Sequence, residues 1–516
     1  MDRGITRPMA RQAHGAELEE AGKERSEQHG EDSGMPSRMD RLRAQQRQVL
    51  WIPWTLILLG FWQLLVPLTL GYGNEALWAE PSGGRGVWFS DETMAPLRAS
   101  LMTWSDVISG VLLLVLGWRA LKPDRPIAWW GACFVGIWLV FAPIVLWSPT
   151  ASGFVNDSIV GLLVIALTIL IPGMPNMTAF MTMGPPTPPG WSYNPSSWPQ
   201  RAILAALAFV GLVVSRYLAA FQLGYLESVW DPFFGSASTE SVLNSSISHM
   251  LPISDAGLGG IAYTFEFLMA FMGGVARWRT MPWMVAMFGV LVIPLGLAHI
   301  ALVMSMPVAV HAWCTFCILA GLVMLPMVAL TVDEVVAMGQ HVKQSRRRGD
   351  RDGSTWKIFW QGGQAEGCTP DERTPEMLEL PDRPLTLLRS SLWGTGAPLP
   401  LLAVAALGVG LYAAPGVLGI DIRSGTADVA HLGGAFVVVV AVVAMAEVLR
   451  PVRLLNVAGG LGVAGLVLLT GPGVVPAAVI VLTGLVVAVL SVPRGPLHDH
   501  YGEWDRPARW PERRSA

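Results

Sequence analysis

Cys314 and Cys317 are the residues of this sequence whose type and spacing best fit a chemical reaction, because they form the motif Cys-Thr-Phe-Cys. At the start of a helix, a two-residue spacer puts both sulfurs on one face within bonding range. The positive end of the helix also favours the thiolate of the first cysteine. A reversible disulfide needs this geometry. The other two cysteines, Cys133 and Cys368, stand alone in the sequence.

Two other interpretations of the pair stay open on these residues. Cysteines are also small apolar side chains that a helix can bury without any chemistry. His311 precedes the pair by three residues, and the set His311, Cys314 and Cys317 would suit a soft metal ion if a fourth ligand came from elsewhere. Three ligands on one helix converge poorly, so no metal site is predicted.

The composition sets the class of protein that must position these sulfurs. The chain has 516 residues, of which 52% are hydrophobic and 14% are charged, as is typical of a membrane protein. Its formal net charge is -3, and its basic residues form no patch that would neutralise phosphates. Nucleic-acid binding is therefore not expected.

A membrane helix needs about 20 mostly apolar residues, and about 12 stretches qualify. We therefore predict an all-α polytopic membrane protein with about 12 transmembrane helices. The expected spans are 51–72, 102–118, 127–147, 156–172, 202–224, 257–274, 282–304, 308–331, 398–415, 429–449, 454–471 and 474–492.

The Lys and Arg residues orient these spans, because cytoplasmic loops retain positive charge. With both termini inside, the outer loops hold only Arg85, Arg98 and Arg423. The prediction is a multi-pass protein of the cell (inner) membrane with both termini cytoplasmic. If the eighth span starts at Val308, Cys314 lies roughly 9 Å below the outer start of its helix.

The polar segments divide the chain. We expect a disordered cytoplasmic tail at 1–50, a Pro/Met-rich cytoplasmic linker at 173–201, a second linker at 332–397 and a cytoplasmic tail at 493–516. Between them lie three groups of four helices, which are a module at 51–172, a core bundle at 202–331 and a second module at 398–492.

The phrase Asp106-Val-Ile-Ser-Gly110 recurs as Asp157-Ser-Ile-Val-Gly161, at the expected start of two spans. Asp at a helix start accepts backbone N–H bonds, and Gly one turn later lets another helix approach closely. We therefore expect capping and packing roles, with an ion site as the alternative. The two outer modules resemble the SPW-repeat family of membrane domains over about 100–172 and 400–492, a resemblance that implies no known chemistry.

The core bundle, 202–331, resembles the vitamin K epoxide reductase family in three phrases that occur in the family's order. These are Ser215-Arg-Tyr217, the loop phrases Val242-Leu-Asn-Ser245 and Ala256-Gly-Leu-Gly259 with Tyr263, and Trp313-Cys-Thr-Phe-Cys-Ile318. The resemblance implies a four-helix bundle around a quinone, with Cys314 and Cys317 as catalytic residues and Cys317 facing the quinone. It also implies Asn244, Ser245 and Tyr263 as quinone-binding residues.

The family's second cysteine pair, in the outer loop, is missing. Thr239 stands at one of its positions, and no cysteine lies between Tyr225 and Gly257. The resemblance then implies a thiol/disulfide oxidoreductase that exchanges directly with an extracytoplasmic thiol protein and uses a membrane quinone. The alternative is a non-catalytic membrane scaffold that binds lipid or a partner. Arg216 and Glu266, at similar depth in two spans, are expected to form an ion pair.

Overall fold

Helices build the whole of the described structure. The computed structural model describes residues 47–79, 91–122, 125–169, 185–251, 253–374 and 384–510, and no strand occurs within these ranges. The predicted tail at 1–50 and the first part of the linker at 173–201 lie mostly outside the described residues.

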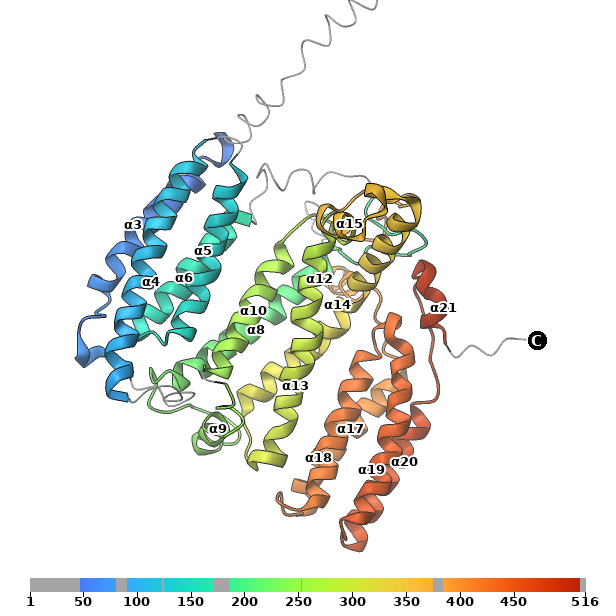
Figure 1. The fold of residues 1–516 in the computed structure, drawn as a ribbon. Helices are drawn as coiled ribbons and strands as arrows, with labels where there is room; N and C mark the ends of the chain where they lie inside the picture. Colours follow the sequence, from blue (N-terminus) through green and yellow to red (C-terminus); the bar gives the residue numbers. More distant parts are fainter. Residues whose placement is uncertain are drawn as a thin grey trace, which may run out of the picture.

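Three groups of helices stand side by side, and Figure 1 shows them in blue, in green to yellow, and in orange to red. The first bundle contains α3 (Trp51–Thr69), α4 (Asp91–Ala120), α5 (Pro126–Val145) and α6 (Ala151–Ile169). The core contains α8 (Trp198–Gln222), α10 (Asp255–Phe271), α12 (Pro282–Val290), η3 (Leu291–Leu295), α13 (Gly296–Ser305), η4 (Met306–Val310) and α14 (Thr315–Arg348). The third bundle contains α17 (Leu399–Leu418), α18 (Gly425–Val443), α19 (Leu455–Leu469) and α20 (Val474–Leu490).

The short helices α9 (Ser236–Leu243) and α15 (Thr355–Gln361) mark opposite ends of the core, which we call the α9 end and the α15 end (Figure 1). Each of the twelve predicted spans corresponds to a helix or to a continuous helical run, and among the described residues ten are long and apolar enough to cross a membrane. The other two, α10 and α20, have 17 residues each. The all-α polytopic class is confirmed.

The start of α14 differs from the prediction. Residues 306–310 belong to the preceding helical run, His311 has a left-handed φ of 54°, and α14 begins only at Thr315. The turn was hidden because apolar residues occupy it, so hydropathy continues across the reversal of the chain. Cys314 is therefore the N-cap of α14 and does not lie a turn and a half inside the helix.

The predicted ion pair between Arg216 and Glu266 is also wrong. Arg216 on α8 donates to the Ser158 hydroxyl on α6 and lies over the ring of Phe154. Both carboxylate oxygens of Glu266 are buried with no hydrogen-bond partner in the described structure. Similar depth in the membrane is therefore not enough to predict that two charged side chains will pair.

Close glycine contacts join the helices of each outer bundle in pairs. A Cβ built on a glycine of these pairs would lie between 2.3 and 3.0 Å from the partner's carbonyl oxygen. The pairs are Gly60 with Gly110, Gly136 with Gly161, Gly408 with Gly434, and Gly460 with Gly484. This confirms the packing role expected for Gly110 and Gly161, and it gives both bundles the same construction from two helix pairs.

Substituting one of these glycines should separate its helices. We expect Gly460→Ala to destabilise the third bundle by about 1–3 kcal/mol, because the added methyl group overlaps the Gly484 carbonyl. Gly462→Ala on the same helix is the control, since nothing lies within 4 Å of its Cβ position, and it should change stability by less than about 1 kcal/mol. Unfolding of both variants in detergent micelles measures the difference, and equal losses would contradict the close contact.

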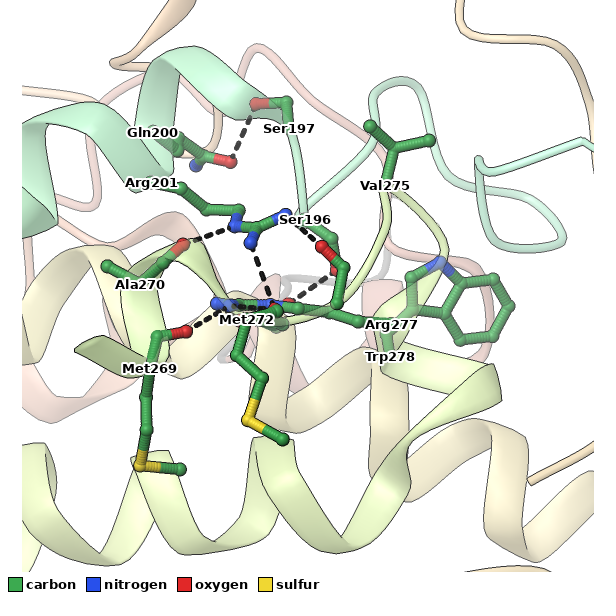
Figure 2. A network of polar contacts seen from close by, with 12 residues as sticks. Ser196, Ser197, Gln200, Arg201, Met269, Ala270, Met272, Val275, Arg277 and Trp278 are labelled. Atoms are coloured by element: carbon green, nitrogen blue, oxygen red, sulfur yellow. Dashed lines mark hydrogen bonds and ion pairs between the residues drawn. The ribbon is translucent and has the colours of Figure 1, made fainter. Parts of the chain in front are cut away.

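A buried polar network holds the α15 end of the core together (Figure 2). Arg277 donates to both oxygens of Glu334 on α14, at 2.6 and 2.7 Å, and to the carbonyls of Met269 and Met272. Arg201 on α8 donates to the carbonyls of Ala270, Met272 and Gly273 at the C-terminal end of α10. These bonds fix α8, α10 and α14 to one another, and α14 carries the cysteines at its other end.

Candidate functional site

Cys314 and Cys317 form a disulfide at the start of α14. Their Cα atoms are 5.3 Å apart, within the usual range for a disulfide. The backbone N–H of Cys317 donates to the Cys314 sulfur at 3.1 Å, so this sulfur serves as the N-cap of the helix. After reduction, the same N–H and the positive helix end would stabilise a thiolate on Cys314.

The two sulfurs differ in access. Cys314 is fully buried, whereas Cys317 is half-buried and, like Val310, Ala312 and Phe316, packs against the main apolar cluster of the core. Leu319 and Leu322, which follow on α14, are exposed. A thiol reagent or a lipid-soluble molecule therefore reaches Cys317 before it reaches Cys314.

Hydrogen bonds of Asp231 join the loop before α9 to the start of α14, between the two cysteines. Its Oδ2 accepts the backbone N–H of Thr315 at 2.8 Å and the Thr239 hydroxyl at 2.6 Å, while its Oδ1 accepts the Thr315 hydroxyl at 2.6 Å. Oδ1 also accepts the backbone N–H groups of Phe233 and Phe234. A carboxylate thus lies at the N-terminus of α14, hydrogen-bonded to Thr315, the residue that follows Cys314.

The role of Asp231 could not be predicted from the sequence. Its one local signal is the pair Asp231-Pro232, which favours a turn. Nothing in the sequence showed that this turn lies against α14, because the two segments are 84 residues apart.

A second contact fixes Trp313, the residue that precedes Cys314. The Ser238 hydroxyl of α9 donates to the Trp313 carbonyl at 2.8 Å and accepts the Trp313 N–H at 2.9 Å. The Trp313 ring contacts the rings of Tyr412 and His431, which lie on α17 and α18. The third bundle therefore packs directly against the disulfide segment.

The ionisation of Asp231 matters because the group lies outside the spans and beside a redox pair. Burial raises the pKa of this carboxyl, but hydrogen bonds from Thr239, Thr315 and the backbone of Phe234 lower it by more, so the net pKa is below its usual range. Because the pKa is lowered in the folded state, the ionised Asp231 carboxylate stabilises the fold at pH values above the ordinary pKa of Asp. This stabilisation is lost as the pH falls through the folded-state pKa. The hydrogen bonds of Asp231 with Thr239 and Thr315 should therefore persist from about pH 5 to 8.

Removing this charge should change the redox balance of the cysteines. A negative charge beside the helix start opposes a thiolate on Cys314, so Asp231→Asn should stabilise the reduced form and raise the reduction potential by about 10–30 mV. Equilibration in glutathione buffers followed by alkylation measures this shift. Glu227→Gln removes an exposed charge from the same loop and is the control, and an equal shift in both variants would contradict the effect.

The three predicted quinone-binding residues differ in burial and in hydrogen bonding. Tyr263 is fully buried and donates to the carbonyl of Ala320, one turn beyond Cys317 on α14, at 2.9 Å. Ser245 is half-buried, and its hydroxyl oxygen accepts the Ser248 N–H at 3.3 Å. Asn244 is exposed at the end of α9. Tyr263 is thus the member of this set that packs in the same apolar cluster as the cysteines.

A metal centre built on His311 receives no support. The Nδ1 atom of His311 is 3.0 Å from the carbonyl oxygen of Pro307, and both cysteine sulfurs are used in the disulfide. Within the described ranges no group of three or more His, Cys, Asp or Glu side chains is placed to hold a metal ion.

The core bundle matches a known family. Residues 202–332, which are 131 of the 516 residues, match the Vitamin K epoxide reductase family. Comparisons with curated proteins and with solved structures found no match to the chain. The family match confirms the resemblance seen in the core and suggests a membrane thiol oxidoreductase. It does not extend to the first or third bundle.

Proposed function

We propose that this protein is a membrane thiol/disulfide oxidoreductase that passes electrons from an extracytoplasmic thiol protein to a membrane quinone through Cys314 and Cys317. The observation that carries the proposal is the disulfide at the start of α14, inside the segment that matches the family. The unequal burial of the two sulfurs supports a defined order of attack.

In the first half-reaction, a thiolate of the partner protein attacks Cys317, because this sulfur is the accessible one. The bond between Cys314 and Cys317 breaks, and Cys314 leaves as a thiolate that the Cys317 N–H stabilises. A second thiol of the partner then displaces Cys317. The partner gains a disulfide, and this protein gains two thiols.

In the second half-reaction the two thiols return to the disulfide and release two electrons and two protons. A quinone supplies the matching chemistry, since it accepts two electrons and two protons to become a quinol. The site fits such a molecule at Cys317, which is half-buried among apolar side chains close to exposed leucines on α14. Cys317 would act on it, and Cys314 would close the disulfide again.

Polar groups near the site would orient the quinone carbonyls. We propose Asn244, Ser245 and Tyr263 for this role, and the contacts favour Ser245 as a donor, because its oxygen accepts one bond and its proton is not used in any described bond. Tyr263 already donates to Ala320. Its hydroxyl would have to leave that carbonyl in order to bind a quinone.

The loop chemistry supports direct exchange with the partner. Thr239, at a position where the family has a loop cysteine, is buried and hydrogen-bonded to Asp231. A hydroxyl and a carboxylate cannot accept or donate electrons. The pair of Thr239 and Asp231 therefore holds the loop in place and takes no part in electron transfer. The partner thiol must therefore reach Cys317 itself.

The proposal also includes the orientation of the protein in the membrane and the nature of the first and third bundles. The α9 end would face outward, with both termini cytoplasmic and the protein in the cell membrane, because the short loops at the α15 end carry most of the Arg and Lys residues. The first and third bundles would be SPW-repeat-like modules. Their shared construction from glycine-paired helices supports a common origin.

Thiol alkylation in isolated membranes tests the proposal. After mild reduction, Cys314 and Cys317 should both be alkylated, and incubation with a short-chain quinone before alkylation should protect them by re-forming the disulfide. Cys133 and Cys368 provide internal references in the same chain. Labelling that does not respond to quinone would favour the alternative, a membrane scaffold that binds lipid or a partner.

A further inference from the structure

Two carboxylates are buried inside the first bundle, away from the disulfide. Asp106 lies fifteen residues after the start of α4 and Asp157 six residues after the start of α6, and each is 0% exposed. Neither can cap its helix, since only the first turn has N–H groups without partners. The capping role expected from the sequence is therefore wrong, because both helices begin earlier than hydropathy indicated.

The two aspartates share one polar cluster. Asp157 Oδ1 accepts from the side-chain amides of Gln63 at 2.7 Å and Asn156 at 3.0 Å. Asp157 Oδ2 and both oxygens of Asp106 are buried without a hydrogen-bond partner in the described structure. The two carboxylates interact electrostatically with each other, and Asp106 also interacts with Gln63.

Tyr72 adds a fourth oxygen to this cluster from the turn after α3. Its side chain is 1% exposed, and its hydroxyl lies against Asp106 and Ser148 without meeting the geometry of a full hydrogen bond in the described structure. Gly153 makes room for the hydroxyl, because a Cβ there would lie 2.4 Å from the Tyr72 oxygen. A buried tyrosine hydroxyl therefore lies beside two buried carboxylates.

Two basic side chains lie near the cluster, and each contacts an aromatic ring. Arg98 lies two turns away on α4, over the ring of Trp147. Arg216 contacts Ser158, the neighbour of Asp157 on α6, and lies over Phe154. Two carboxylates inside a membrane bundle need a positive charge close by, since an uncompensated charge at this depth is strongly unfavourable.

We propose that Asp106, Asp157 and Tyr72 form a binding site for a monovalent metal cation, with Na⁺ as the expected occupant. The four oxygens that lack a hydrogen bond of full geometry are hard ligands, which suit alkali and alkaline-earth cations and not soft metals. They are too few for Ca²⁺, which takes 6–8 oxygens, and the described structure offers no third acidic, His or Cys ligand for a divalent metal. The site is separate from the cysteines and does not depend on the redox proposal.

Binding of ²²Na⁺ to the purified full-length protein in detergent tests this site, with choline chloride keeping the ionic strength constant. We expect saturable binding to the wild type and binding weakened about tenfold or more in Asp106→Asn and in Asp157→Asn, since each loses a charged ligand. Tyr72→Phe should weaken binding less, because it removes a neutral ligand.

Asp428→Asn is the matched control, because Asp428 is the one carboxylate in α17–α20 and has no acidic neighbour on those helices. It should bind ²²Na⁺ like the wild type. Thermal unfolding gives a readout that also covers poorly folding variants, since Na⁺ should raise the unfolding temperature of the wild type more than choline does. Absence of specific ²²Na⁺ binding between pH 6 and 9, or equal binding by Asp106→Asn, would overturn the proposal and leave a shared proton as the neutralising charge.

Discussion

Cys317→Ser should reduce quinone-linked thiol oxidation by at least about 100-fold, to the rate seen without protein, because it removes the sulfur that a partner can reach. The remaining Cys314 is fully buried, so this variant should also fail to form a mixed disulfide with the partner. Quinone reduction in membranes supplied with a reduced thiol protein measures the loss.

Cys314→Ser gives a different expected result, which makes the test sharper. It leaves Cys317 accessible but without a neighbouring sulfur to resolve an intermediate. When this variant is given the oxidised partner, the Cys317 thiolate should attack the partner disulfide and release one partner sulfur as a thiolate, and the mixed disulfide should accumulate and appear on a non-reducing gel after acid quenching. Cys133→Ser and Cys368→Ser are matched controls that should keep full activity. If Cys317→Ser retained half of the wild-type rate, or if Cys314→Ser trapped nothing, the proposed order of attack would be wrong.

Breaking the ion pair at the α15 end should cause the largest loss of stability. Arg277 and Glu334 are 0% and 3% exposed, and two hydrogen bonds join them. Removing either partner leaves the other charge buried, so Arg277→Ala and Glu334→Ala should each lower the free energy of unfolding by about 3–5 kcal/mol. Denaturant unfolding in detergent micelles measures it.

An exposed pair supplies the comparison. Lys343 and Glu503 are 2.9 Å apart but 55% and 39% exposed, so Lys343→Ala should cost no more than about 1 kcal/mol. Joint replacement of Arg277 by Met and Glu334 by Leu should be less damaging than either alanine substitution, since no charge is left unpaired. Additive losses in the double variant would show that the two residues do not act as a pair.

Much of the architecture was predictable because a membrane imposes simple rules on a chain. A helix that crosses lipid must be apolar along its length, so each of the twelve predicted spans fell on a helix, including the long run from Pro282 to Val310. Hydropathy could not find the ends of helices where apolar residues form the turn. This is why the start of α14 differs from the prediction, whereas α4 and α6 start earlier than predicted because their first turns include polar residues.

The candidate site was partly predictable for a related reason. The spacing of Cys314 and Cys317 is local, and a local spacing fixes local geometry, so the disulfide followed from four residues. Asp231 and Ser238 were not predictable, since they reach the cysteines through contacts between segments at least 75 residues apart. The pairing of Arg216 failed because hydropathy gives the depth of a side chain and not the direction in which it points.

By itself, the sequence of this protein determined that it is a helical membrane protein with a redox-capable cysteine pair at a helix start, because composition and short spacings act along the chain. The tertiary structure decided which sulfur is accessible, which carboxylate stands beside the pair, and that Asp106 and Asp157 share one buried cluster. These features depend on the rotational orientation of each helix and on how the helices pack against one another. Contacts between segments far apart in the chain cannot be predicted from the spacing of residues along it.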